Sequence, residues 1–199
     1  MTTPRLILAS GSRYRRQQLT VAGYEFEAIT PNTDETSKPN ELPHELAKRL
    51  AFQKAVAVLT SRPNAIVIGA DQVCAFGDQS LGKPGTTEAA KAQLHLIASQ
   101  VVTFHSAVAV LSANNSHQFI VPTEIAIRDL TPAEIARYVE LDSPVDTAGA
   151  IKSELRGPHL FNRVTSDDPS ALIGLPLIRL AATLREFGIN PLSSNDPKT

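Results

Sequence analysis

Residues 65–83 read AIVIGADQVCAFGDQSLGK, and the rest of the chain is organised around this stretch. Residues 65–70 carry no polar side chain and are rich in β-branched residues, which predicts a strand buried on both faces of a sheet. Asp71 follows at once, so we expect the strand to end at this acid. In open α/β sheets ligands bind beyond the carboxyl ends of such strands, and the small Gly69 and Ala70 leave room for something to approach the backbone. Asp71 is therefore the first candidate for chemistry, with a turn cap as the alternative.

The composition bounds the class of protein. A chain of 199 residues with 42% hydrophobic and 20% charged residues can bury a full core, so we expect a single domain over residues 1–192 with a polar tail at 193–199. A formal net charge of -1 gives no field that would attract nucleic acid or an anionic membrane. The single cysteine, Cys74, cannot form an internal disulfide, and no apolar stretch approaches the roughly 20 residues of a spanning helix. We expect a cytoplasmic protein with no nucleic-acid or membrane partner.

A basic run follows a second short apolar strand at residues 6–9. Ser10, Gly11 and Ser12 interrupt that strand, and a helix that starts with RYRR follows. Free N–H groups at a helix N-terminus, serine hydroxyls and guanidinium groups all donate hydrogen bonds toward a multiply charged anion. Cations in the first turn oppose the helix dipole, so these arginines do not serve helix stability. This pattern predicts phosphate binding by Ser10, Ser12 and Arg15, with a solvated basic face as the alternative.

Two lysines are further candidates for phosphate contacts. Lys54 falls on the apolar stripe of a helix predicted at residues 43–60, so it either snorkels or meets a negative charge; we expect the second. Lys83 lies between Gly82 and Pro84 on a stiff turn, which suits a fixed point charge. Residues 77–83 match the first seven positions of a phosphate-loop signature, but proline replaces the Ser or Thr that would follow.

The acids and cations together indicate a metal-assisted phosphate site. Glu35 lies on a polar loop at residues 31–40, where a merely solvated acid is the alternative. The histidines show no pair at metal-ligand spacing, which argues against zinc. Carboxylates at Glu35 and Asp71 beside the cations Arg15, Lys54 and Lys83 suit a hard divalent cation, Mg²⁺ or Mn²⁺, bridging to a polyphosphate.

The remaining pattern extends the sheet and covers it with helices. A threonine-capped helix is predicted at residues 87–98, and the sequence TPAE opens another at 131–141. Two strands at residues 101–112 and 118–129 read as an antiparallel hairpin. The small residues in 146–150 indicate a close backbone approach, and the last helix opens at 174–176.

Seven segments in one order carry a family resemblance. LILASGSRYRRQQL, DET, RLAFQKA, IGADQVC, LGKP, VDTAGAIKSE and ALIGLPL resemble the Maf (septum formation inhibitor) family of nucleoside triphosphate pyrophosphatases along almost the whole chain. The resemblance implies an α/β fold of the Maf/ITPase-like kind: an elongated mixed β-sheet flanked by helices, two lobes and a central cleft. Arg13 departs from the family motif, which usually has proline there, and Tyr14 stands where a tryptophan is also found.

The resemblance also implies an activity and assigns residues to it. A nucleoside triphosphate is hydrolysed between its α- and β-phosphates in the presence of a divalent cation, and Asp71 is the proton acceptor that activates water. At positions 14, 72 and 154 the chain resembles the branch of the family that hydrolyses 7-methyl-GTP, with Tyr14, Gln72 and Glu154. The branch acting on dTTP and UTP carries Arg, Thr and Gln at these positions.

Other functions stay open from the sequence. They are a dTTP/UTP pyrophosphatase of the same family, a phosphate-loop kinase or NTPase built on residues 77–83, and a non-catalytic nucleotide-binding regulator of cell division. A nucleoside triphosphate is the expected partner, and a homodimer remains open.

Overall fold

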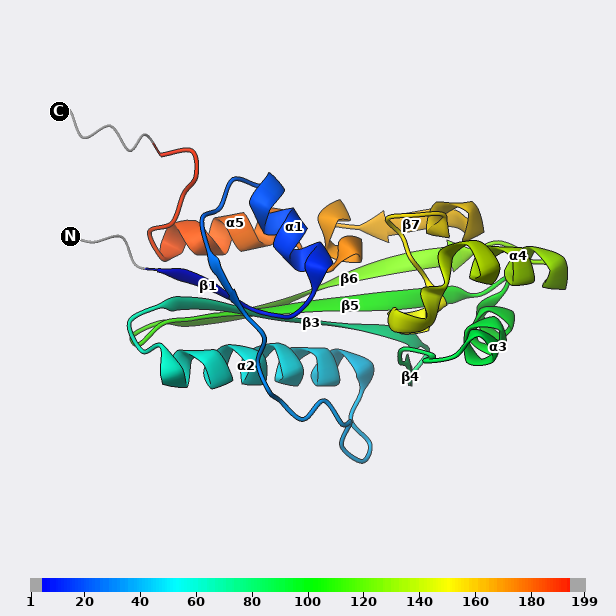
Figure 1. Cartoon of the computed structure of the whole chain (residues 1–199), viewed down its shortest axis with the longest axis horizontal. Coiled ribbons are helices and arrows are strands. Elements are labelled where there is room, and N and C mark those ends of the chain that lie inside the picture. Colours follow the sequence, from blue (N-terminus) through cyan, green and yellow to red (C-terminus); the bar gives the residue numbers. More distant parts are fainter. Residues whose placement is uncertain (1–4, 194–199) are drawn as a thin grey trace.

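The computed structural model describes residues 5–193, and its core is one long mixed sheet (Figure 1). The seven strands run in the order β2-β1-β3-β5-β6-β7, with β4 paired to β3. β1 is parallel to β2 and β3, and the other pairs are antiparallel. The strands are β1 (Leu6–Ala9), β2 (Glu27–Ile29), β3 (Ile66–Phe76), β4 (Gln79–Leu81), β5 (Val101–Leu111), β6 (Ser116–Ile127) and β7 (Phe161–Ser166).

Helices cover both faces of this sheet. In Figure 1, α2 lies along one face, α1 and α5 lie on the other, and α3 and α4 gather at the end remote from the two termini. The α-helices are α1 (Arg13–Val21), α2 (Pro43–Ser61), α3 (Thr87–Ile97), α4 (Pro132–Asp142) and α5 (Leu177–Glu186). The predicted mixed α/β fold with flanking helices is confirmed, and the division into two lobes stays a prediction.

The prediction that the central strand ends at Asp71 is wrong. β3 is one continuous strand, because β5 pairs with it in antiparallel register from Val67 through Asp71 to Ala75. Its parallel neighbour β1, by contrast, makes its last pair between Ala9 and Gly69. Asp71 therefore lies beyond the carboxyl end of β1, although it is in the middle of β3. The strand end at which a ligand is expected to bind is the end of β1.

Gly69, two residues before Asp71, allows α2 to pack closely on β3. A Cβ atom on Gly69 would collide with the carbonyl oxygen of Ala51 and lie 2.6 Å from the backbone nitrogen of Ala55. The backbone of α2 therefore rests directly on β3, and the close approach expected at Gly69 is made by a helix. This contact carries Lys54, in the same part of α2, to the side of the sheet where Asp71 lies.

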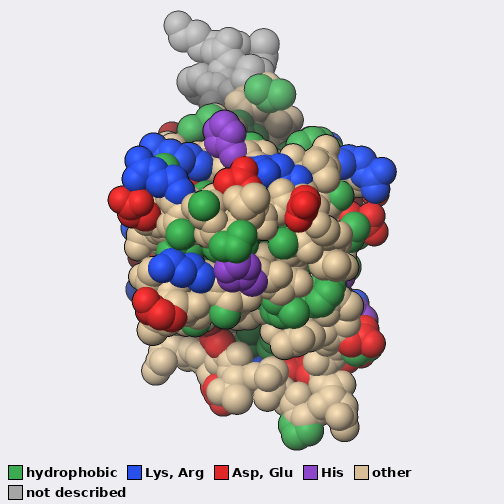
Figure 2. All heavy atoms as spheres, turned by 90° about the vertical axis from the view of Figure 1, so that its right-hand side faces the viewer, with side chains coloured by type: hydrophobic (Ala, Val, Ile, Leu, Met, Phe, Trp, Pro, Cys, Tyr) green, Lys and Arg blue, Asp and Glu red, His purple; other side chains and the backbone are tan. Residues whose placement is uncertain are grey.

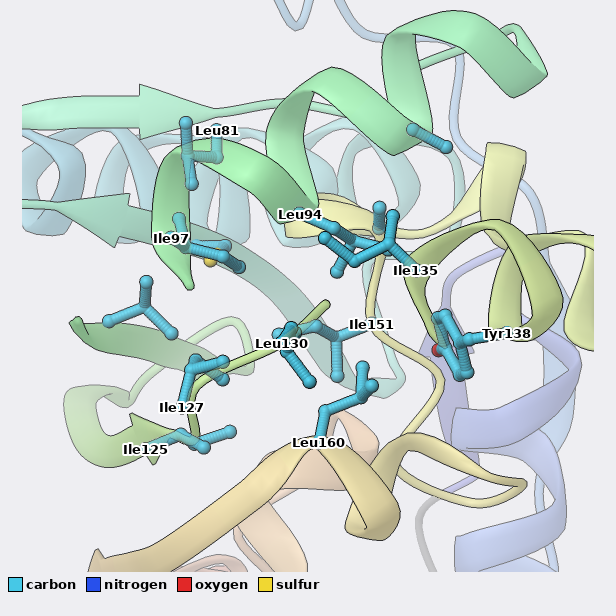
Figure 3. Packing of buried hydrophobic residues seen from close by; sticks show 14 of the residues in the cluster. Leu81, Leu94, Ile97, Ile125, Ile127, Leu130, Ile135, Tyr138, Ile151 and Leu160 are labelled. Atoms are coloured by element: carbon cyan, nitrogen blue, oxygen red, sulfur yellow. The ribbon is translucent and has the colours of Figure 1, made fainter. Parts of the chain in front are cut away.

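A large apolar cluster holds the end of the sheet that carries α3 and α4 (Figure 3). Leu94 and Ile97 from α3, with Ile135 and Tyr138 from α4, pack toward the sheet. Ile151 joins the same cluster and anchors the segment that leads to Glu154. Further apolar clusters lie between the sheet and the helices α1, α5 and α2.

Local signals for turns and caps mostly hold. The β5–β6 hairpin forms, and in α4 the Thr131 hydroxyl accepts from Glu134 N while the Glu134 carboxylate accepts from Thr131 N. Residues 77–83 form the β3–β4 hairpin and a turn, so the strand–loop–helix arrangement of a phosphate loop is absent there. Of the polar tail expected at 193–199, only Ser193 lies within the described residues.

The surface carries charges of both signs. Figure 2 looks onto the end with α3 and α4, where Lys, Arg, Asp and Glu side chains alternate with small hydrophobic patches. Within residues 5–193, no helix combines the length and the apolar character needed to cross a membrane.

Candidate active site

A cleft of about 760 Å³ opens where β1 ends, between the start of α1, the loop before α2, and the segment after α4. It brings together every side chain singled out from the sequence as a site residue. These are Ser10, Ser12, Tyr14, Arg15, Glu35, Lys54, Asp71, Gln72, Lys83 and Glu154. It is also lined by Arg13, Thr30, Asp146 and Ser153, which the sequence reasoning did not select.

An acid–cation centre lies at the middle of the cleft. The Nζ atom of Lys54 is 2.6 Å from Asp71 Oδ1 and 2.6 Å from Glu35 Oε1. Lys54 and Asp71 are buried, and the Glu35 side chain is 55% exposed on its loop. The expectation that Lys54 meets a negative charge is confirmed, and the structure adds a second carboxylate to it.

Charge controls the ionisation of Glu35. Burial opposes ionisation, but the hydrogen bond from Lys54 and the positive charges of Lys54, Lys83 and Arg15 outweigh it and lower the pKa of Glu35. Glu35 is therefore a carboxylate at neutral pH, available to a cation in the cleft.

The same two carboxylates fit a magnesium-like ion. Glu35 and Asp71 converge on one point, which is now taken by the Lys54 ammonium. Among residues 5–193 there is no group of three or more His, Cys, Asp or Glu side chains that could hold a metal alone. Mg²⁺ is typically bound through one or two carboxylates, with water and substrate phosphates completing its shell. The donor set therefore fits an ion that shares its ligands with a bound triphosphate.

Arg15 is held by two backbone carbonyls and one serine hydroxyl, from three parts of the fold. Its Nε donates to Gly174 O at 3.1 Å, and its Nη1 donates to Ala70 O at 3.0 Å and to Ser10 Oγ at 3.3 Å. Burial lowers the pKa of Arg15, against the opposing charges of Asp71 and Glu35. Nη2 makes no hydrogen bond to the described residues, so this donor remains for an anion in the cleft.

The two serines shape the turn into α1. Ser12 is the N-cap residue, and its Oγ accepts from Arg15 N at 3.4 Å. Ser10 Oγ accepts from Ser12 N at 3.2 Å and from Arg15. Neither hydroxyl donates to another group within the described chain, so both hydrogens can point toward phosphate oxygens.

The other part of the cleft presents hydrogen-bond acceptors. The Gln72 amide nitrogen donates to Ser106 Oγ at 2.9 Å and to Ala171 O at 2.9 Å, which leaves Gln72 Oε1 as the group still able to bind. Glu154 Oε1 is buried and has no hydrogen-bond partner among the described residues. A buried, unpaired acceptor is costly, which favours a ligand that donates to it.

Lys152 fixes the segment that carries Glu154. Its Nζ donates to the carbonyls of Asp142 and Ser143 at 3.1 Å each and lies 3.0 Å from Asp146 Oδ1. Its backbone N donates to the Tyr138 hydroxyl at 2.9 Å. This support was not predicted from the sequence, although a lysine directly after the apolar Ile151 was a usable signal.

Cys74 has a packing role in this region. A Cβ on Gly149, which has φ +66°, would lie 2.6 Å from Cys74 Sγ, so the predicted close backbone approach at 146–150 is made against this cysteine. Burial raises the pKa of the Cys74 thiol to about 12. The thiol is therefore neutral and unsuited to nucleophilic attack.

A salt bridge ties the Glu35 loop to α2. Glu41 accepts from Arg49 Nε at 2.6 Å and from Nη2 at 2.7 Å, and Nη2 also donates to Thr36 O, next to Glu35. The hydrogen bond from Arg49 lowers the pKa of Glu41 from 4.5 to about 2. This two-pronged pair fixes the loop close to Glu35.

We expect the stabilising effect of Glu41 to disappear in acid. Its pKa is lower in the folded than in the unfolded chain, so its contribution is fully present above pH 4.5 and is lost as the pH falls toward about 2. Urea unfolding should show Glu41→Gln less stable than the wild type at pH 7, with most of this difference lost near pH 2. Glu25→Gln, at an exposed position, serves as the control. A difference as large near pH 2 as at pH 7 would contradict the ion-pair explanation.

Comparison with known proteins gives the family. A family model described as Maf-like protein matches residues 5–187, and the chain belongs to this family. Its relatives include three proteins named 7-methyl-GTP pyrophosphatase. One, from Bordetella avium strain 197N, is 48% identical over 96% of this chain and 97% of its own length. Another, from Xanthomonas oryzae pv. oryzae strain MAFF 311018, is 47% identical over 94% and 98%. A third, from Aromatoleum aromaticum, is 46% identical over 95% and 98%.

Proposed function

We propose that this protein hydrolyses 7-methyl-GTP to 7-methyl-GMP and diphosphate and so removes a modified nucleotide. The near full-length relatives of that name support the reaction class. The observation that carries the substrate choice is the unpaired, buried Glu154 Oε1 in the same cleft as the acid–cation centre.

The base end of the cleft complements a methylated guanine. Guanine offers N1–H and an exocyclic amine on one edge, two donors that Glu154 and Gln72 Oε1 can accept. Methylation at N7 gives the ring a positive charge, which favours an acidic neighbour and the aromatic face of Tyr14. A uracil or thymine ring offers one N–H on the matching edge and would leave an acceptor unpaired.

The other end complements the triphosphate and the attacking water. Asp71 accepts the proton of the water that attacks phosphorus, and the ammonium of Lys54 holds its carboxylate in place. Arg15, Lys83, Ser10 and Ser12 donate to phosphate oxygens and stabilise the charge that develops in the transition state.

Glu35 and Asp71 would hold the divalent cation, Mg²⁺ or Mn²⁺. When bound, such an ion neutralises phosphate charge and polarises the bond between the α- and β-phosphates. Cytoplasmic location and a homodimer remain predictions.

A panel of nucleotides tests this proposal. With Mg²⁺ or Mn²⁺, diphosphate release should be faster from 7-methyl-GTP than from GTP, and slower still from dTTP and UTP. Glu154→Gln should reduce kcat/KM for 7-methyl-GTP by roughly tenfold or more, because an amide places a donor where a carboxylate placed an acceptor. The control is Glu25→Gln, which is exposed and lies outside the cleft.

Two outcomes of this nucleotide panel would contradict different parts of the proposal. Preference for dTTP or UTP would overturn the assignment of Tyr14, Gln72 and Glu154 and leave the pyrophosphatase activity standing. Tight nucleotide binding without turnover would favour the non-catalytic regulator instead.

A further inference from the structure

Arg13 covers the aromatic ring to which the base is assigned. Its guanidinium carbon lies 4.7 Å from the centre of the Tyr14 ring, and its Nη2 donates to the Tyr14 hydroxyl at 2.6 Å. Both residues line the cleft. A guanidinium in this position is a flat cation on an aromatic face.

Two carboxylates act on the same cation. The hydrogen bond to Tyr14 raises the pKa of Arg13, and the negative charges of Asp146 and Glu154 act in the same direction. Asp146 is bound by Lys152 at 3.0 Å, whereas Glu154 Oε1 has no hydrogen-bond partner within residues 5–193. Arg13 therefore occupies the kind of environment that a positively charged purine would require.

Helix stability does not account for this arginine. Arg13 is exposed at the first position of α1, and a positive charge there opposes the helix dipole. Replacing it with a neutral residue should leave the fold intact.

We infer that Arg13 is a specificity-determining residue. It occupies the place of the charged base and lowers the preference for 7-methyl-GTP over GTP. The inference rests on the proposed function. 7-Methylguanine carries a positive charge, so it must displace Arg13 or lie beside it, and two cations at one ring repel each other. Neutral guanine meets no such repulsion. Arg13 therefore disfavours the methylated base more than the unmethylated one.

A charge series at position 13 tests the inference. The ratio of kcat/KM for 7-methyl-GTP to that for GTP should rise about threefold to tenfold in Arg13→Gln, and further in Arg13→Glu. The increase should shrink at high salt, because the two charges meet near solvent. Arg16→Gln is the matched control, since Arg16 is exposed on the same helix and does not line the cleft.

Each result decides a different point. A rising ratio in the position-13 series with an unchanged ratio in Arg16→Gln supports the inference. An unchanged ratio in both Arg13 variants overturns it, as does an equal loss for both nucleotides, which would show that Arg13 binds phosphate or either base. If the wild type prefers dTTP or UTP, the inference fails together with the proposed base choice. If the wild type prefers 7-methyl-GTP or GTP and the kcat/KM ratio does not change in the position-13 variants, the inference alone fails.

Discussion

Asp71→Asn is expected to lower kcat for 7-methyl-GTP by about a hundredfold or more while the protein stays folded. The amide keeps the shape of the carboxylate but cannot accept the proton of the attacking water, and general-base catalysis typically contributes on this scale. Lys54 keeps its second carboxylate, Glu35, at 2.6 Å, so the buried ammonium is not left without a partner. Diphosphate release at saturating substrate measures the effect, and thermal unfolding checks the fold.

Asp78→Asn provides the matched control for this variant. Asp78 is exposed in the turn after β3 and does not line the cleft, so the same chemical change should leave kcat unaltered. Near-normal turnover in Asp71→Asn would remove the catalytic assignment from Asp71.

Lys54→Met should cost both activity and stability. Its ammonium separates two carboxylates, and removing one partner of a buried ion pair typically costs 3–5 kcal/mol. Since Glu35 is largely exposed, we expect about 2–4 kcal/mol in urea unfolding. Turnover should fall by about a hundredfold, because the proposed base Asp71 loses the ammonium that holds its carboxylate in place.

Turnover measured on the folded Lys54→Met protein separates catalysis from stability. The kcat of the folded fraction should still fall, because Asp71 has lost the ammonium that lies 2.6 Å from its carboxylate. A normal kcat in a folded but less stable variant would show that Lys54 has a structural role only.

Lys83 gives the contrasting case. It is exposed on the turn after β4, so Lys83→Ala should raise KM with no change in melting temperature. Lys48→Ala, exposed on α2 and outside the cleft, is the control for lost surface charge. The two lysines, equal candidates in the sequence, thus differ because only one of them is buried between acids.

Some of the site could be predicted because its signals are local. The apolar stripe of α2 placed Lys54 toward the core, where an ammonium requires a negative partner. The Ser-rich break after β1 and the basic turn that follows indicated an anion site at a helix N-terminus. In both cases the side chains lie within about two turns of one element, a range over which backbone geometry fixes their relative directions.

By itself, the sequence determined the order of the five α-helices, the hairpin of β5 and β6, the capped start of α4, and the residue types gathered at the site. It did not predict the strands β4 and β7. The tertiary structure alone decided that β3 continues past Asp71, that α2 fills the space at Gly69, and that Arg13 lies over Tyr14. The physical reason is that periodicity and caps act over a few residues, whereas strand pairing and side-chain contacts depend on which distant segment packs alongside. Asp71, which was predicted to end a strand, lies in the cleft because β1, the parallel neighbour of β3, ends before it.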